Sequence, residues 1–589
     1  MQELQRHQPA SLLLACRWSL RDFIAAAGLF FATAAVVLWQ NAHLVILWDL
    51  SYTLDSSMRI ALGQMPYRDF PFVHTPLTFL IQAAIIRLTG RVFFHHVLYA
   101  TIMGGLGTVL TWRIALNTLR GRLEGWWIVS LLLTAPLTLL GIYCILSHPS
   151  YDCDCIFFVL VAVLLLQRVE ADSVIASTQN QANLVRSFAA GAAVTLPLFF
   201  KQNIGLPFLA VALASILLLL VAKFMVPNSS VSPGAPALLA VLGGAIATLL
   251  AGALLIQFTA GLGNCIHWII QFAAQRRMPG FKDMVGIYLQ PSFVWMLPCV
   301  AAALLLLRAP FIKNKWAQAL ALVLLAAPFL WTLLALFFYD DADERGDNLL
   351  ALWPLLLVLS AILTLFNLRR GLNLRALLPV MVLAAINGTF LSQQLWGSTY
   401  AIWPLLILLI AEMIVFLATL NLPRLAQAMA GVIAITLLVC GGLYTASEER
   451  LSYTRLPEGQ ILHSTFPQLA GMSASGDYLP NFEELLRFAA ANIPMSDGLI
   501  LLPGEDPFYF ATGRVPQFPV LLFDPATDPY SPAELVQEAR ARNIRWLIVK
   551  RDLQINTDPT PQREATLKAL LHDFTLNKRL QGYDIYRRL

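Results

Sequence analysis

The chain has 589 residues, of which 58% are hydrophobic and only 13% charged, and its formal net charge is +5. The mean hydropathy is +0.66, whereas a soluble domain carries about 25% charged residues. This composition excludes a cytosolic enzyme, a disordered chain and a nucleic-acid binder. It indicates a polytopic membrane protein. No cysteine follows Cys440, so the C-terminal region is not a disulfide-stabilised scaffold.

A membrane-spanning helix needs about 20 mainly apolar residues. The sequence predicts about 13 such helices, at residues 22–40, 95–117, 125–146, 154–169, 187–200, 204–225, 235–258, 292–308, 316–338, 348–367, 376–391, 398–420 and 425–445. The first apolar run continues without a small-residue cleavage site, so we expect an uncleaved first helix.

The segment 76–90 decides the orientation of every later loop. Its apolar stretch is only about 14 residues long, a length typical of an interfacial or re-entrant segment. With that interpretation and an inside N-terminus, the inner loops hold 16 Lys and Arg residues, and the outer loops before residue 446 hold nine. The positive-inside rule favours this orientation. With an odd number of spans, the C-terminal region lies on the outer side of the membrane. Counting 76–90 as a further span would place every later loop on the opposite side.

The sequence predicts two domains, a transmembrane domain at 1–446, with its first outer loop at 41–94, and an extracytoplasmic α/β domain at 447–589. In the second domain, strand-like runs at 498–502 and 544–550 alternate with helix-like runs at 482–493 and 531–543. The domain has neither a GxGxxG nor a P-loop sequence, so no nucleotide site is indicated.

The first outer loop contains an unusual concentration of charged residues near the membrane. We expect Asp49 at the end of the first helix, half-shielded by Trp48 and Leu50, where a carboxylate can take a proton from a hydroxyl as a general base. Further along, the loop offers candidate substrate-binding residues at Asp55, Arg68, Asp69 and His74, with Arg59 as a candidate phosphate ligand. Ordinary salt bridges in a solvated loop are the alternative for Asp55, Arg59 and Asp69.

This loop resembles that of the GT-C glycosyltransferases, and more narrowly the bacterial branch related to protein O-mannosyltransferases and aminoarabinose transferases. The matching residues are Asp49, Arg59, Gly63, Pro66, Tyr67, Arg68, Asp69, Phe70, Pro76 and Leu77. The resemblance covers about residues 20–300. It implies that Asp49 activates an acceptor hydroxyl for attack on a sugar carried by a polyprenyl phosphate. Those enzymes usually carry Asp-Glu or Asp-Gly at this position, whereas this chain has Asp49-Leu50.

A second outer segment, SHPSYDCDC at 147–155, contributes His148, Asp152 and Asp154. The resemblance implies an aspartate here near the acceptor or a metal. Residues at i and i+2 do not share a helix face, so we expect one of Asp152 and Asp154 to point into a substrate-binding site. The Cys-Asp-Cys spacing differs from the CxxC spacing of tight zinc sites. We therefore predict no cofactor, although a divalent metal remains compatible with the sequence.

Basic residues also occur next to apolar segments, where burying their charge in the membrane would be energetically costly. Lys201 is flanked by apolar residues, and a lysine at such a depth either snorkels or binds an anion. Arg276 and Arg277 lie in an outer loop, 259–291, that breaks the positive-inside trend. Lys or Arg can neutralise a departing phosphate, and the resemblance implies a Lys and an Arg in that role. Lys201 and Arg276 or Arg277 are the candidates, with snorkelling as the alternative.

Two further outer segments have weaker signals. The acidic stretch 339–348 is compatible with simple solvation. The aromatic residues Trp396, Tyr400 and Trp403 first indicate an interfacial belt and second a surface for stacking sugars, which makes Tyr400 a candidate substrate-binding residue.

Three functions remain open from the sequence. The first is an inverting glycosyltransferase of the bacterial inner membrane, with a cytoplasmic N-terminus and a periplasmic C-terminal domain. Its partners would be membrane lipids, a polyprenyl-phosphate sugar donor and a glycan, lipid or protein acceptor, with no nucleic acid. The second is a transporter or flippase, which would place charges near the bilayer midplane; here only Glu412 lies near a helix centre. The third is a non-catalytic membrane scaffold for cell-envelope glycans.

Overall fold

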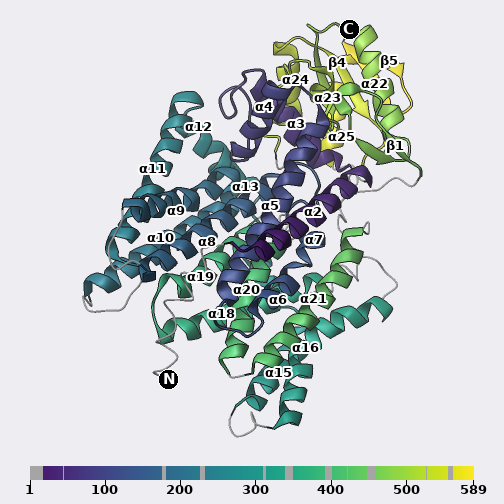
Figure 1. The fold of residues 1–589 in the computed structure, drawn as a ribbon. Coiled ribbons are helices and arrows are strands. Elements are labelled where there is room, and N and C mark those ends of the chain that lie inside the picture. Colours follow the sequence, from purple (N-terminus) through teal and green to yellow (C-terminus); the bar gives the residue numbers. More distant parts are fainter. Residues whose placement is uncertain are drawn as a thin grey trace.

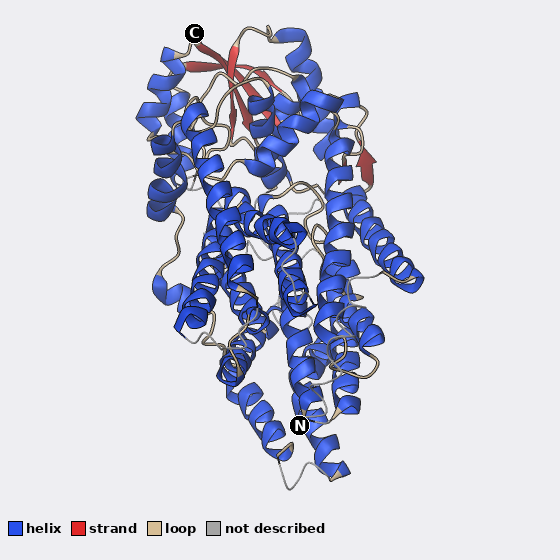
Figure 2. Cartoon of the chain, turned by 60° about the vertical axis from the view of Figure 1, so that its left-hand side comes forward, coloured by secondary structure: helices blue, strands red, loops and turns tan. Residues whose placement is uncertain are grey.

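The computed structural model describes residues 18–588, except 44, 176–180, 226–232, 309–313, 339–348, 392–400, 421, 447–458, 525–526 and 555–560. A long helical body is followed by a small domain that contains the β-strands, and this domain lies at one end of the body (Figures 1 and 2). The acidic stretch 339–348 and the residues Trp396 and Tyr400 lie outside the described residues.

The helical body is that of a multi-pass membrane protein. Eight described helices are long and apolar enough to cross a membrane: α2 (Leu20–His43), α5 (Phe93–Leu119), α9 (Gln181–Phe200), α10 (Gln202–Met225), α11 (Ala235–Thr259), α16 (Lys315–Phe338), α18 (Leu352–Arg370) and α21 (Pro423–Ala446). The remaining predicted spans coincide with α6 (Trp126–Thr134) and α7 (Leu137–Leu140), α8 (Tyr151–Ile175), α15 (Phe293–Leu306), α19 (Leu374–Thr389) and α20 (Trp403–Thr419). The ambiguous segment forms α4 (Leu77–Thr89), whose 13 residues are fewer than a span needs.

Glycines allow α9 and α11 to pack closely. A Cβ at Gly191 would lie 1.8 Å from the Val241 carbonyl oxygen, and a Cβ at Gly244 would lie 2.0 Å from that of Phe188. Small residues at such crossings let two helix backbones approach each other within a membrane. This contact fixes the position of α11, which leads into α12 (Leu262–Ile266), the π-helix η2 (His267–Phe272), α13 (Ala273–Arg276) and α14 (Phe281–Gly286).

Two residues singled out in the sequence have partners within the helical body. The carboxylate of Glu412 lies 3.6 Å from the guanidinium of Arg122, so a basic partner accompanies this charge within α20. Trp403 is fully buried and packs edge-on against Trp353, with ring centroids 5.6 Å apart. Its expected place in an interfacial belt was therefore wrong, because the indole fills the core between α18 and α20.

The C-terminal domain is built on a four-stranded sheet in the order β3-β4-β6-β5. Strand β3 (Gly498–Leu502) runs parallel to β4 (Ile544–Lys550), whereas β6 (Tyr583–Arg588) pairs antiparallel with both β4 and β5 (Phe574–Arg579). A separate pair of short strands consists of β1 (Ile461–His463) and β2 (Ser473–Ser475), joined through the short 3₁₀-helix η5 (Pro467–Leu469). The helices are α22 (Tyr478–Asn492), α23 (Phe508–Thr512), α24 (Pro532–Ala541) and α25 (Pro561–Leu570).

Alternating side chains of the sheet separate two hydrophobic cores. Leu499 and Leu501 belong to a core that includes α22, whereas Ile500 and Leu502 pack with α24 and α25. The first core also contains Leu50 and further apolar residues of α3 (Leu47–Ala61), the helix of the first outer loop. The C-terminal domain is thereby joined to α3 by a continuous hydrophobic core.

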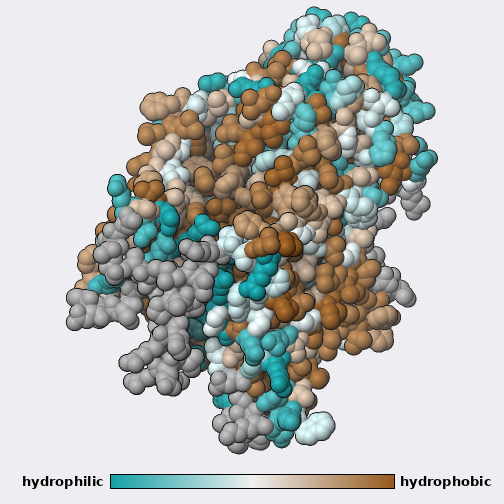
Figure 3. All heavy atoms as spheres, viewed as in Figure 1, coloured by the Kyte–Doolittle hydropathy of each residue, from teal (hydrophilic) through white to brown (hydrophobic). Residues whose placement is uncertain are grey.

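The visible surface follows the same division. Hydrophobic side chains cover the middle of the helical body, whereas hydrophilic side chains gather over the C-terminal domain at the upper right (Figure 3). This distribution agrees with a membrane-embedded body and a domain in water.

Candidate functional site

Asp49 lies in the first turn of a separate helix rather than at the end of the first one. Helix α2 ends at His43 and α3 begins at Leu47, so the sequence prediction placed Asp49 on the wrong helix. A helix N-terminus carries partial positive charge and favours an ionised carboxylate. The half-buried Asp49 therefore lies at the positive end of the α3 dipole.

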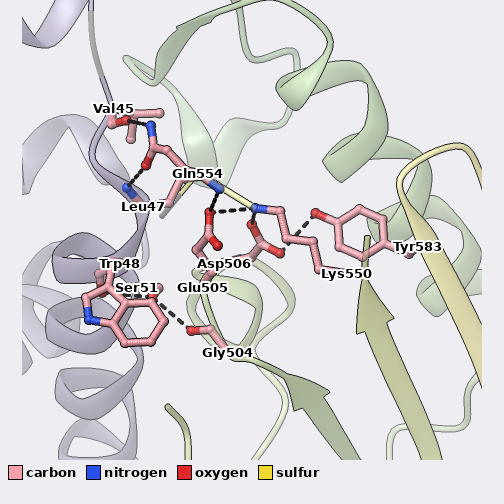
Figure 4. A network of polar contacts seen from close by, with 10 residues as sticks. All are labelled: Val45, Leu47, Trp48, Ser51, Gly504, Glu505, Asp506, Lys550, Gln554 and Tyr583. Carbon is pink, nitrogen blue, oxygen red and sulfur yellow. Dashed lines mark hydrogen bonds and ion pairs between the residues drawn. The ribbon is translucent and has the colours of Figure 1, made fainter. Parts of the chain in front are cut away.

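Hydrogen bonds attach the C-terminal domain to residues on both sides of Asp49. The Gln554 side chain donates to the Val45 carbonyl at 2.8 Å and accepts from the Leu47 N–H at 2.7 Å. One turn further, the Ser51 hydroxyl donates to the Gly504 carbonyl at 3.0 Å. Figure 4 shows these contacts between the start of α3 and the C-terminal domain. They fix the turn that carries the Asp49 carboxylate.

Tyr151, the first residue of α8, brings the candidate residues together. The His74 ring stacks on the Tyr151 ring with centroids 4.2 Å apart, and the Lys201 ammonium lies 4.4 Å from the same ring centre. Asp49 interacts electrostatically with the Tyr151 hydroxyl. Tyr151 is not among the residues predicted from the sequence, although it directly precedes Asp152 at the start of a helix. Nor is Tyr52, whose ring contacts His74 edge-on at 5.4 Å.

Lys201 and Asp152 form a buried ion pair. The Lys201 ammonium lies 2.7 and 2.9 Å from the two carboxylate oxygens of Asp152, and the two side chains are only 7% and 8% exposed. Lys201 lies at the break between α9 and α10, where the backbone changes direction. The lysine therefore has an anionic partner inside the protein, whereas the snorkelling alternative expected its ammonium to point toward the lipid headgroups.

Arg277 joins this group through His74. Its guanidinium lies 3.1 Å from Nε2 of His74, and since a guanidinium only donates, Nε2 must be the unprotonated nitrogen. Burial holds the pKa of His74 well below its usual range, and the positive charges of Arg277 and Lys201 add to this effect. A neutral imidazole therefore orients Arg277. The Tyr67 hydroxyl donates to the His74 carbonyl at 2.5 Å and fixes the loop.

Lys201 and Arg277 lie on the wall of an apolar groove with a volume of about 400 Å³. The rest of the wall consists mainly of leucine, isoleucine and alanine side chains from α9, α10, α11, α12 and η2, among them Leu206, Ile256 and Ile269. An apolar surface with two cationic groups fits a ligand that combines a hydrocarbon chain with an anion.

Three other candidates interact with the C-terminal domain and do not line the groove. The carboxylate of Asp55 accepts the N–H groups of Phe510 at 2.7 Å and Tyr509 at 3.2 Å, at the start of α23. Burial raises the pKa of Asp55 to about 8, against the opposing effect of these two donors. Arg59 donates to the Pro519 carbonyl at 2.9 Å. Arg276 interacts electrostatically with Asp528.

The remaining candidates hold the outer loops together. Arg68 and Asp69 form an ion pair at 2.8 Å that is largely exposed, and Asp69 also accepts the Met65 N–H at 2.7 Å. Asp154 accepts hydrogen bonds at 2.6 to 2.8 Å from the hydroxyl groups of Thr78, Tyr99 and Tyr143. Asp152 and Asp154 thus have different surroundings, as their spacing predicts. Nδ1 of His148 lies 3.3 Å from the Pro149 carbonyl oxygen.

No known sequence family matches this chain. No curated protein matches it either.

Several solved structures are similar in fold to this chain. ArnT from Cupriavidus metallidurans, bound to undecaprenyl phosphate, is 12% identical, with 96% of this chain and 98% of that chain covered and a TM-score of 0.46. The Archaeoglobus fulgidus oligosaccharyltransferase with zinc and sulfate is 10% identical, with 89% and 68% covered and a TM-score of 0.48. The protein O-mannosyltransferase complex Pmt1-Pmt2 of S. cerevisiae, bound to its sugar donor, is 17% identical, with 44% and 34% covered and a TM-score of 0.32.

All three are GT-C glycosyltransferases, the class that the first outer loop resembles. Their identities with this chain stay below 25% and their TM-scores below 0.5. Because one fold can carry many activities, the function of this chain has to be argued from the site itself.

Proposed function

We propose that this chain is an integral-membrane glycosyltransferase that moves a sugar from a polyprenyl-phosphate donor to an acceptor hydroxyl at the outer face of the membrane. The observation that carries the proposal is the position of Lys201 and Arg277 on the wall of an apolar groove, where the Lys201 ammonium lies 4.4 Å from the centre of the Tyr151 ring.

The groove supplies both kinds of contact that such a donor needs. The polyprenyl chain packs against apolar side chains such as Leu206, Ile256 and Ile269. The phosphate lies against Arg277 and Lys201, whose charge-assisted hydrogen bonds are stronger than those of neutral donors. Asp152 holds the Lys201 ammonium in place and offsets its charge, so the net positive charge beside the phosphate comes from Arg277.

The reaction then needs one base and one stabilised leaving group. The proton of the acceptor hydroxyl passes to the Asp49 carboxylate while the hydroxyl oxygen bonds to the anomeric carbon of the sugar. The bond from that carbon to the phosphate oxygen breaks on the opposite face, so the configuration inverts. The phosphate leaves with the bonding electron pair, and Arg277 neutralises its added charge while the Lys201 ammonium donates a hydrogen bond to it.

The same proposal gives the orientation of the chain. We place the N-terminus in the cytoplasm and the C-terminal domain in the periplasm of a bacterial inner membrane. The asymmetry of 16 inner against nine outer basic residues supports this orientation. The pairing of Glu412 with Arg122 gives this carboxylate a structural partner and weakens the case for a transporter.

Two neighbouring arginines provide a matched test of the donor site. Arg277 lines the groove, whereas Arg276 does not and lies 5.7 Å from the centre of the Phe272 ring. We expect Arg277→Gln to weaken binding of undecaprenyl phosphate by the purified chain about ten- to a hundredfold, the loss of one charge-assisted contact. Arg276→Gln removes the same charge and should change the affinity less than threefold.

Equal losses of affinity in the two arginine variants would show a general effect of charge and would contradict a specific role of Arg277. Absence of binding by the unaltered chain would refute the donor assignment.

A further inference from the structure

A second cavity, with a volume of about 580 Å³, lies where the C-terminal domain meets the start of α3. Its walls come from β1 and β2, the start of α22, the end of β4 and the residues just before α3. Leu47, Lys550, Gln554 and Tyr583 belong both to this wall and to the contacts drawn in Figure 4. We call this cavity the junction pocket.

The wall of the junction pocket differs chemically from that of the apolar groove. Tyr478 and Tyr583 supply aromatic rings, and Asn481 and Gln554 supply amides. The side-chain oxygen of Asn481 is buried and has no hydrogen-bond partner among the described residues. Aromatic rings combined with amides offer both apolar faces and hydrogen bonds to one ligand. A buried oxygen without a partner is costly unless a ligand or water in the pocket donates to it.

The charges of the pocket argue against an anionic ligand. Lys550 is the one Lys or Arg among the described lining residues, and its ammonium lies 3.2 Å from Glu505 and 2.9 Å from Asp506. These two carboxylates already neutralise it. Asp477 and Asp552 are exposed at the wall and add negative charge. A phosphate or sulfate would therefore meet net repulsion, whereas a neutral molecule with several hydroxyl groups would find donors and acceptors.

We propose that the junction pocket binds a neutral carbohydrate, and that this carbohydrate is part of the acceptor glycan. The second half of the statement rests on the proposed function. The position of the pocket supports it. Leu47 and Gln554 line the pocket, and the Leu47 N–H donates a hydrogen bond to the Gln554 side chain. Leu47 lies only two residues before Asp49. The volume lies within the usual range for ligand pockets, about 300–1,000 Å³. A glycan seated there lies beside the turn that carries the base.

Saturation-transfer NMR on the full chain in lipid nanodiscs tests the proposal. The probes are maltose, lactose and chitobiose, with inorganic phosphate as the anionic probe. We expect transfer to at least one sugar and no competition by phosphate. Asn481→Ala should weaken sugar binding at least tenfold. Asn492→Ala is the matched control on the same helix, since its exposed side chain donates to the Phe488 carbonyl at 3.0 Å outside the pocket.

The outcomes separate this proposal from the proposed function. No transfer to any of the three sugars, or equal transfer in Asn481→Ala, would overturn the carbohydrate site, and competition by phosphate would overturn the neutral ligand. Undecaprenyl phosphate affinity is measured on the same samples. Sugar binding without lipid binding would refute the donor assignment and leave the carbohydrate site supported. Lipid binding without sugar binding would refute the carbohydrate site and leave the donor assignment supported. If Asn481→Ala does not fold, Asp552→Ala at the exposed wall gives the same test.

Discussion

The buried pair of Lys201 and Asp152 allows the strongest quantitative prediction. Replacing either residue alone, as Lys201→Met or Asp152→Asn, leaves the other charge in a place where the side chains are only 7% and 8% exposed. Leaving one charge of a buried pair uncompensated costs about 3–5 kcal/mol, whereas removing both charges together is often nearly neutral. We therefore expect each single variant to be strongly destabilised and the double variant to recover most of the loss.

The assay is thermal unfolding of the purified chain, followed with a thiol-reactive dye. The dye reports unfolding because Cys153 and Cys155, on the same turn of α8, are free and buried in the folded chain. A double-mutant cycle then gives the coupling between the two charges. Additive losses in the double variant would refute the ion pair as the source of the effect.

Two predictions concern the C-terminal domain. Because burial raises the pKa of Asp55 to about 8, above the value near 4 of an exposed carboxyl, the stability that its protonated form contributes is present at low pH and is lost as the pH rises through 8. The melting temperature should fall from pH 6 to pH 9, and Asp55→Asn should reduce that fall; an unchanged pH dependence would contradict the assignment. Lys550→Met leaves Glu505 and Asp506 buried without their cation, so we expect faster proteolysis of this domain at neutral pH and partial recovery at low pH, where the carboxylates are protonated. Equal proteolysis at both pH values would show that charge is not the cause.

Hydropathy and local patterns predict much of the fold. The apolar runs in the first 446 residues correspond to helices, and the predicted strands at 498–502 and 544–550 are β3 and β4. Both strands are largely buried on two faces, which gives continuous apolar runs. Strands β5 and β6 were missed. Strand β5, FTLNKR, is exposed at five of its six positions, so its sequence shows no hydrophobic pattern.

The parts of the site are visible in the sequence, but their arrangement is not. His74, Asp152, Lys201 and Arg277 were singled out as charged or polar residues on the outer face, yet the contact between His74 and Arg277 joins positions 203 residues apart. Local patterns carry no information about such pairing.

The role of Asp55 shows the same limit. Its carboxylate accepts the Phe510 N–H across 455 residues, a contact that depends on how the C-terminal domain packs on α3. No local pattern around Asp55 distinguishes this structural contact from substrate binding.

The variant Asp49→Asn tests most directly whether Asp49 serves as the base of a sugar transfer. The amide keeps the shape of the side chain but cannot take up the proton, and a general base contributes about 10²–10⁴-fold to the rate. The measurement is mass spectrometry of the lipids and surface glycans of a deletion strain that carries either the unaltered chain or Asp49→Asn at equal amounts. We predict a sugar modification that the unaltered chain restores and that Asp49→Asn reduces at least a hundredfold, while undecaprenyl phosphate binding is retained. Identical glycans in the two strains would contradict the account.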